Sequence, residues 1–157
     1  MVQVNPYLNF DGTTEAAFNF YQSIFGGEFV NVTRFKDTPT GDNLSATDRE
    51  KIMHMALPIG QGTILMATDA LESMGHPLTP GNNFHLTVSP DSEAEADQLF
   101  RALSVNGQVN LPLRKEFWGA YFGMLTDQFG VQWMVSYDPN QAARFYNEAT
   151  TACAAFQ

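Results

Sequence analysis

Cysteine is almost missing from this sequence, with Cys153 as its one example. A single cysteine cannot form an intramolecular disulfide, which favours a reducing compartment. No apolar run approaches the roughly 20 residues needed to span a bilayer. Residues 1–6 lack the basic start and the apolar stretch of a signal peptide. We therefore expect a cytoplasmic protein that has no membrane partner.

Basic residues are also scarce. The chain has 8 Lys and Arg against 17 Asp and Glu, which gives a formal net charge of −9. Because such a surface repels phosphate groups, we expect no nucleic-acid partner. The acidic residues are dispersed, which is typical of a charge that keeps a protein soluble. Apolar residues make up 44% of the chain, enough for a core in one domain or in two fused modules.

The first half of the chain predicts the order strand, helix, strand, strand, strand. Alternating apolar residues predict a strand over 2–10. Thr13 or Thr14 can then cap a helix, in which apolar residues recur at helical spacing from Ala17 to Phe25. A second strand is expected over 28–35. The polar segment 36–50 reads as a loop with a short turn at 47–50. Strands over 51–59 and 63–68, joined by a glycine-rich hairpin, complete the set.

The second half repeats this order. Strands are expected over 83–89, 108–114, 119–126 and 131–137, and Ser92 with Glu95 forms the capping box of a helix whose apolar stripe is Leu99, Phe100, Leu103 and Val105. Residues 62–66 align with 130–134. A duplicated βαβββ unit explains both halves, although a chance match of element order is the alternative. We predict an α+β fold with module 1 over 1–68, a linker over 69–82, module 2 over 83–137 and a helical tail over 138–157.

Two four-stranded sheets, each with its helix on one face, can form a cup-shaped mixed sheet. Strand alternation predicts which side chains line the cup and which pack under a helix. On the third strand either His54 or its apolar neighbours face inward, and we favour His54. The alternative is that another chain or water covers this face. The inward set is Asn5, Tyr7, Asn9, His54, Ile64, Met66, Thr68, Asn83, His85, Thr87, Gln132, Met134 and Ser136, and the packed set includes Val4, Leu8, Phe10, Phe84, Leu86, Val88 and Trp133.

Three stretches resemble the PhnB-like branch of the vicinal-oxygen-chelate superfamily, which includes glyoxalases, bleomycin-resistance proteins and dihydroxybiphenyl dioxygenases. The stretches are 6–12 (PYLNFDG), 19–28 (NFYQSIFGGE), and 116–123 (EFWGAYFG) with 126–134 (TDQFGVQWM). The resemblance covers about residues 3–137. It implies paired βαβββ modules, a homodimer and a ligand site in the cup. Proteins of this branch are often described as demethylubiquinone methyltransferases, but the sequence shows no glycine-rich loop for S-adenosylmethionine.

The metalloenzymes of that superfamily bind one divalent ion through His and Glu side chains. The positions that match their ligands are Asn5, Met66 (or Leu65), Asn83 and Met134. Neutral amides and soft thioethers are poor ligands for a hard divalent ion. We therefore expect no metal at the usual position and no cofactor, although a displaced site built from His54 and His85 is an alternative.

The function expected from these residues is binding of an unidentified small molecule. Asn5, Tyr7, Asn83, Trp118, Gln132, Met66 and Met134 are the expected ligand-binding residues. Trp118 could stack on a flat ligand or pack within the protein. The alternative function is an enzyme of lyase, isomerase or dioxygenase type in which His54 or His85 is the acid or base. For each histidine the alternative role is that of a hydrogen-bonded pocket residue.

Overall fold

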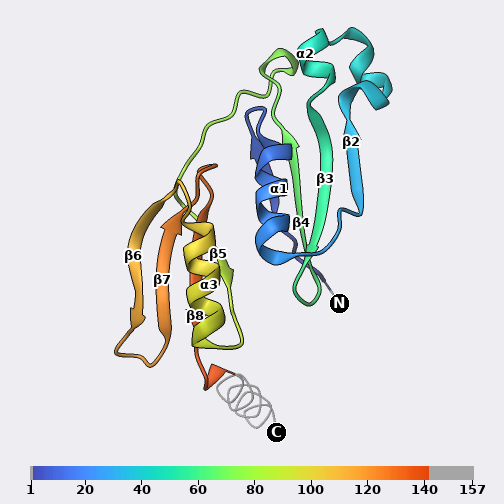
Figure 1. The fold of residues 1–157 in the computed structure, drawn as a ribbon. Helices are drawn as coiled ribbons and strands as arrows, with labels where there is room; N and C mark the ends of the chain where they lie inside the picture. The colour runs from blue at the N-terminus through green and yellow to red at the C-terminus, as the bar shows by residue number, and fades with distance from the viewer. Residues whose placement is uncertain (1, 142–157) are drawn as a thin grey trace, which may run out of the picture. The chain divides into compact units, whose positions relative to one another are not determined.

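The computed structural model describes residues 2–141, and the chain divides into two compact units, Met1–Gly81 and Asn82–Gln157. Each unit contains one four-stranded sheet, with strand order β1-β4-β3-β2 in the first and β5-β8-β7-β6 in the second (Figure 1). In each sheet the first strand runs parallel to its neighbour, and the other pairs are antiparallel. The predicted α+β class and the repeated βαβββ order are confirmed. The predicted helix over 140–156 lies almost entirely outside the described residues.

The first unit follows the predicted order closely. Its strands are β1 (Tyr7–Phe10), β2 (Asn31–Arg34), β3 (Ile52–Ile59) and β4 (Thr63–Asp69), and its long helix is α1 (Thr14–Phe25). The helix ends at Gly26, whose φ of 73° suits glycine. Side chains of α1 pack on alternate residues of the strands because successive strand residues point to opposite faces. This core contains Leu8, Phe10, Ala17, Phe18, Tyr21, Met55, Leu57, Leu65 and Ala67.

The segment between β2 and β3 is more ordered than the predicted loop. It contains the 3-10 helices η1 (Phe35–Asp37) and η2 (Pro39–Asn43) and the short helix α2 (Ala46–Arg49). The Ser45 side chain accepts a hydrogen bond from the Asp48 backbone N–H and so caps α2. A further 3-10 helix, η3 (Glu72–Met74), follows β4 within the predicted linker. The short turn predicted over 47–50 overlaps α2, whereas polar composition did not reveal the three 3-10 helices.

The second unit contains β5 (Leu86–Val88), α3 (Glu93–Leu103), β6 (Gln108–Lys115), β7 (Tyr121–Thr126) and β8 (Gln132–Tyr137). The Ser92 side chain accepts a hydrogen bond from the Glu95 backbone N–H, as the capping-box prediction requires. The Glu95 carboxylate reaches the backbone N–H of Asp91 instead of that of Ser92. Trp133 is 1% exposed, which confirms that it packs away from Met134.

Three apolar residues that were expected to pack under the helices are exposed. Val4 is 88% exposed and Phe84 is 57% exposed, because β1 and β5 begin only at Tyr7 and Leu86. Val105 is 49% exposed, since α3 ends at Leu103. Within β1 and β8 alternation predicted the correct face, but the starts of β1 and β5 were placed too early. The error arises because alternation does not show where hydrogen bonding to the neighbouring strand begins.

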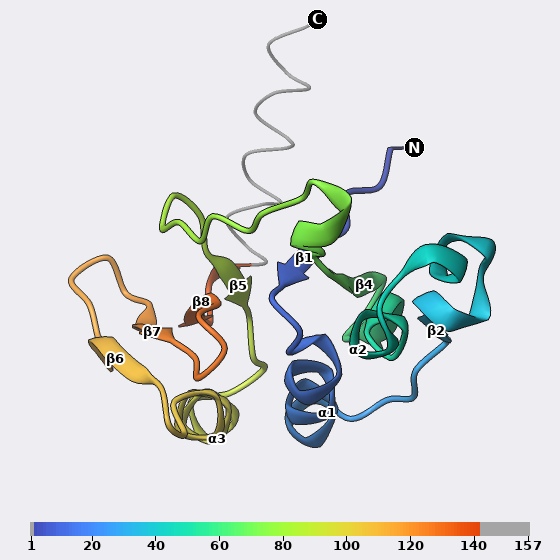
Figure 2. The ribbon, with the colours of Figure 1, turned by 90° about the horizontal axis from the view of Figure 1, so that it is seen from above.

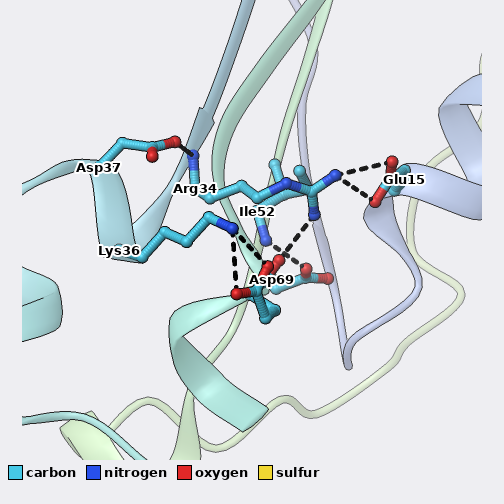
Figure 3. Close-up of polar contacts among 7 residues, drawn as sticks. Glu15, Arg34, Lys36, Asp37, Ile52 and Asp69 are labelled. Carbon is cyan, nitrogen blue, oxygen red and sulfur yellow. Dashed lines mark hydrogen bonds and ion pairs between the residues drawn. The ribbon is translucent and has the colours of Figure 1, made fainter. Parts of the chain in front are cut away.

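A buried carboxylate joins three elements of the first unit. Asp69, at the end of β4, is 3% exposed. Its Oδ1 accepts hydrogen bonds from the backbone N–H of Thr14 (3.1 Å) and from the Thr14 hydroxyl (2.8 Å). Its Oδ2 accepts one from the backbone N–H of Ile52 at 2.8 Å (Figure 3). The start of α1, the start of β3 and the end of β4 therefore share one acceptor group.

A network of ion pairs surrounds this junction (Figure 3). The Arg34 guanidinium on β2 donates to both carboxylate oxygens of Glu15 in the first turn of α1, each at 2.8 Å. It also donates to the backbone oxygen of Glu50 at 2.7 Å, and Lys36 pairs with the Glu50 carboxylate at 2.8 Å. Basic side chains of this unit are thus engaged on the helix side and in the segment between β2 and β3. Among the described helices, none is both long enough and apolar enough to cross a membrane.

Candidate functional site

Each sheet has its helix on one side only. In the first unit α1 packs on β3 and β4, and in the second α3 packs on β7 and β8 (Figure 2). We call the opposite side of each sheet its open face. Side chains that pair directly across neighbouring strands share a face, so the strand register identifies the residues of each open face.

The open face of the first sheet combines polar and apolar side chains. Met66 on β4 lies opposite Tyr7 on β1 and opposite Ala56 on β3. Ala67 and Met55, the next residues, are buried toward α1. His54 is two residues from Ala56 and therefore belongs to the open face, with Thr33 of β2 opposite it. The structure thus places Tyr7, His54 and Met66 together on this face.

Tyr7 and His54 are in direct contact. The Tyr7 hydroxyl oxygen lies 3.4 Å from Nδ1 of His54, and the two ring centroids are 5.8 Å apart. Tyr7 is 46% exposed, so solvent or a ligand can reach the pair. A phenol and an imidazole at this distance can share a weak hydrogen bond, and which atom donates depends on the histidine tautomer.

The Asn5 side chain is hydrogen-bonded to the backbone of the first sheet. Its side-chain oxygen accepts a hydrogen bond from the backbone N–H of Ile64 at 3.0 Å. The backbone oxygen of Pro6 accepts one from Met66 at 3.1 Å. The two bonds extend the seam between β1 and β4 beyond the first residue of β1. The Asn5 oxygen is thus engaged in the fold, which the sequence pattern did not reveal.

The open face of the second sheet is richer in sulfur and aromatic groups. Met134 on β8 lies opposite Thr87 on β5 and Met124 on β7. The Thr87 hydroxyl is 3.7 Å from the Met134 sulfur. Phe122 on β7 lies opposite Ser136 and belongs to the same face. Its side chain is half-buried there.

Three further predicted residues of this unit lie just before β5 or at the start of β8. The side-chain amide of Gln132 donates a hydrogen bond to the backbone oxygen of Phe84 at 2.8 Å. Gln132 thus attaches the segment before β5 to β8, much as Asn5 attaches the segment before β1 to β4. Asn83 is exposed and His85 is half-buried immediately before β5.

Trp118 lies in the turn between β6 and β7 and contacts Phe122. Their ring centroids are 5.7 Å apart with an interplanar angle of 66°. The Phe117 ring lies 5.0 Å from that of Trp118 and nearly perpendicular to it. Trp118 is 41% exposed. The tryptophan therefore both packs within its unit and presents an accessible aromatic surface.

Charge is distributed unevenly over the sheets. Among the residues of the eight described strands Asp69 is the sole carboxylate, and it faces α1. Arg114 on β6 lies opposite Phe122 and so belongs to the open face, where its Nε donates to the Glu116 carboxylate at 2.8 Å. Sequence reasoning missed Arg114. The sequence did contain a signal for this pair. Arg114 and Glu116 are two residues apart, and residues at that spacing in an extended chain point to the same side.

The positions that correspond to the superfamily's metal ligands do not fit a divalent ion. The Asn5 oxygen is engaged by a backbone N–H, and Met66 and Met134 offer thioethers, which suit soft ions. Among the described residues, no three His, Cys, Asp or Glu side chains are grouped as a metal site would require. We therefore derive no reaction step through a metal.

The groups with shifted pKa values lie away from both open faces. Hydrogen bonds from Lys51 and Ser73 lower the pKa of Asp48, next to β3 in the first unit. The hydrogen bond to Asp48 raises the pKa of Lys51. In the second unit Tyr121 donates to Asp97 of α3 at 2.7 Å, and this bond raises the pKa of the phenol. These contacts hold helices and loops to the sheets.

The sequence matches one protein-family model over residues 3–135, that of the Glyoxalase/Bleomycin resistance protein/Dioxygenase superfamily. The protein YjdN of Escherichia coli strain K12 is 30% identical over 141 residues, which cover 85% of this chain and 93% of YjdN.

Solved structures show the same likeness. The protein PA1353 from Pseudomonas aeruginosa is 38% identical with a TM-score of 0.78, and the match covers 88% of this chain and 98% of that protein. A Bacillus cereus PhnB protein, described as a putative 3-demethylubiquinone-9 3-methyltransferase, is 27% identical with a TM-score of 0.71. That match covers 87% of this chain and 99% of the Bacillus protein.

Proposed function

Because the chain belongs to the glyoxalase/bleomycin resistance protein/dioxygenase superfamily, we propose that it binds a small molecule on the open faces of its sheets. The observation that carries the proposal is the composition of these faces. The chain has 17 acidic residues, yet the strands in the part of the chain that the structure describes place none on an open face. Apolar and aromatic walls with a few fixed polar groups are typical of small-molecule sites.

We propose that this binding needs no divalent ion at the superfamily's usual position. Support comes from the groups at that position, which are amides and thioethers. Metal analysis of protein purified without an affinity tag or a chelator tests the proposal. About one equivalent of Mg, Mn, Fe, Co, Ni or Zn that is lost in Asn5→Ala or Asn83→Ala would contradict it.

An enzyme is the second candidate, favoured by the contact between Tyr7 and His54. In this candidate the imidazole takes a proton from the substrate or gives one to it, and the phenol orients the imidazole or relays the proton. His85 is the corresponding candidate acid or base in the second unit. A ligand on either open face would meet one histidine close to a methionine and to hydroxyl groups.

One set of experiments separates the two candidates. A ligand screen by nuclear magnetic resonance identifies a bound compound, and chromatography of the same mixture detects any product. In a binding protein the ligand is recovered unchanged, and His54→Gln and His85→Gln alter affinity only. In an enzyme one of these variants abolishes the product while binding persists, and Tyr7→Phe slows the reaction if the phenol assists His54. A screen with no bound compound would contradict both candidates.

The methyltransferase activity named for the Bacillus cereus relative is not part of this proposal. A doubly wound parallel sheet with a glycine-rich loop is the usual nucleotide-binding arrangement. Each sheet described here has only one parallel strand pair. We further propose a cytoplasmic homodimer. Sedimentation of a stable species near the chain mass of 17.4 kDa at micromolar concentration would contradict the dimer.

A further inference from the structure

The tip of the β6–β7 hairpin brings an arginine and aromatic rings to one side of the second sheet. Lys115 pairs with Glu93 of α3 at 3.0 Å, and its cross-strand partner Tyr121 bonds to α3 as well. These two residues therefore face the helix. Arg114 and Phe122, the next pair in the register, face the opposite side. The Trp118 ring contacts Phe122 on this open side.

The Arg114 guanidinium is oriented by a hydrogen bond to Glu116 and remains accessible to solvent. Its Nε bond to Glu116 uses one of the five N–H donors that a guanidinium carries. The Arg114 side chain is 61% exposed, whereas that of Glu116 is 12% exposed. The more buried carboxylate thus fixes the orientation of the more exposed guanidinium. The two terminal nitrogens of an arginine match the two oxygens of a carboxylate in spacing and plane.

Within residues 2–141, Arg114 is also the one arginine or lysine that the strands place on an open face. Arg34 and Lys115 bond to acidic residues of α1 and α3 on the helix side. An anion that approaches the open face of the second sheet therefore meets one strand-borne cation and no strand-borne carboxylate. Glu116 offsets part of that charge, so recognition depends on the paired hydrogen bonds and on ring stacking more than on net charge.

We propose that Arg114, Trp118 and Phe122, which we call the hairpin site, bind an aromatic carboxylate. The carboxylate forms two hydrogen bonds with the terminal nitrogens of Arg114. The ligand ring stacks on the accessible surface of Trp118, with Phe122 beside it. The proposal rests on the proposed small-molecule binding and names its ligand class. All three residues lie within one unit, so the site is defined by the second unit alone.

The test uses the full chain and three probes that each alter one feature. Benzoate has the ring and the charge, benzamide keeps the ring without the charge, and cyclohexanecarboxylate keeps the charge without the aromatic ring. Binding is followed by nuclear magnetic resonance through the indole N–H signals. Trp118 reports on the site, and Trp133 is an internal control because it is 1% exposed and bonded to Asp127. We expect benzoate to shift the Trp118 signal and to bind about tenfold more tightly than the other two probes.

Substitutions then test whether benzoate binds at the hairpin site. Arg114→Gln should lower benzoate affinity about tenfold, to the level of benzamide, and leave benzamide binding unchanged. Arg114→Lys should lose part of the affinity because an ammonium cannot pair with both oxygens in one plane. Trp118→Leu should weaken benzoate and benzamide alike. Arg101→Gln, which removes the same charge from α3 in the same unit, is the matched control and should have no effect.

The outcomes distinguish this inference from the proposed function. Equal binding of benzoate and benzamide, unaffected by Arg114→Gln, would overturn the ligand class while small-molecule binding stands. Absence of any shift of the Trp118 signal would overturn the hairpin site, and the ligand screen described above tests the other open-face residues separately. If Trp118→Leu converts a dimer to a monomer in sedimentation and leaves benzoate affinity unchanged, the aromatic residues form a protein interface and the inference is wrong.

Discussion

The two units have the same strand order but different residues at corresponding positions. The β3–β4 and β7–β8 hairpins align without a gap, with Met55 opposite Ala67 in one and Gly123 opposite Val135 in the other. On the open face, His54 therefore corresponds to Phe122. The first unit presents a phenol and an imidazole, and the second presents aromatic rings with an arginine. A duplicated fold has thus acquired two surfaces with different chemistry while its hydrogen-bonding framework is retained.

Beneath the helices, the same alignment shows that corresponding residues of the two units differ in side-chain volume. Met55 fills the first unit at the position where the second has Gly123. A Cβ atom on Gly123 would lie 2.7 Å from Cε2 of Phe100 and 2.9 Å from the Cα of Leu113. In the second unit the Phe100 ring of α3 occupies the space that a side chain at this position would need. The space under the helix is thus filled by a strand residue, Met55, in the first unit and by a helix residue, Phe100, in the second.

The buried carboxylates of Asp69 and Asp127 differ in how far away in the sequence their hydrogen-bond donors lie. Asp69 accepts hydrogen bonds from residues 55 and 17 positions away in the sequence. Asp127 accepts bonds from Phe129, Val131 and Trp133, all within six positions. The first carboxylate joins distant elements, and the second organises one turn and the strand that follows it. The stability of the two units should therefore respond differently to the loss of these carboxylates.

The largest expected effect is that of Asp69→Ala. Three buried donor groups would lose their acceptor, so we expect the free energy of unfolding of the first unit to fall by about 3 kcal/mol or more. Asp127→Ala is the matched variant. We expect it to cost about 1–2 kcal/mol, because two of its three donors are near the surface and water can replace the lost acceptor. Amide hydrogen exchange measures both units in one experiment. If both variants lose the same amount of protection from hydrogen exchange, the sequence separation between a carboxylate and its donors does not affect stability.

A smaller effect is expected for Gly123→Ala. The added methyl group would press on Phe100 and on the backbone of Leu113, at a cost of about 1–3 kcal/mol for the second unit. Thermal denaturation measures the loss. Phe100→Leu in the same chain should restore part of the stability, since the shorter side chain frees the contested space. If Gly123→Ala alone is as stable as the parent chain, α3 is less tightly packed than the structure shows.

The smallest expected effect is a difference in the response of the units to acid. The hydrogen bond from Lys51 lowers the pKa of Asp48, so its contribution to stability is present above the ordinary value of 3.8. That contribution is lost as the pH falls through the lowered pKa. We expect the amide signals of α2 to shift below about pH 4 and Asp48→Asn to abolish this shift. A shift above pH 5 would mean that the bond to Lys51 is absent in solution.

Alkaline pH should affect the second unit through Tyr121. Its bond to Asp97 raises the pKa of the phenol, so the stabilisation is present below the ordinary value of 10.0 and is lost as the pH rises through the raised value. Absorbance of tyrosinate should show that the Tyr121 phenol titrates above pH 10.0, and the amplitude of that late step should fall in Tyr121→Phe. A titration identical in the parent chain and in Tyr121→Phe would contradict the assignment. Lys51 also loses its proton at high pH, so Tyr121→Phe isolates the contribution of the second unit.

Local patterns predicted much of this molecule. The apolar spacing of α1, the Ser92 cap of α3 and the glycine turn between β3 and β4 depend on neighbours close in sequence, and all three were confirmed. The reciprocal bond from Glu95 to Ser92 was not, because Glu95 bonds to the backbone of Asp91. The preference for His54 on the open face rested on alternation alone, and the strand register agrees with it. Prediction failed where a strand needed its partner to define its beginning, as at Val4 and Phe84.

The sequence by itself determined the fold class, the repeat and the face of most strand residues, because periodicity and caps are properties of short segments. Only the tertiary structure decided which polar groups are engaged. It directed the Asn5 oxygen to the backbone of Ile64, brought Tyr7 to His54, and placed Arg114 beside the aromatic tip of its hairpin. These contacts join residues that are distant in sequence or depend on strand register and bulges. The physical reason is that a side chain's partners are set by which strands pair and in what register, and no local pattern encodes that choice.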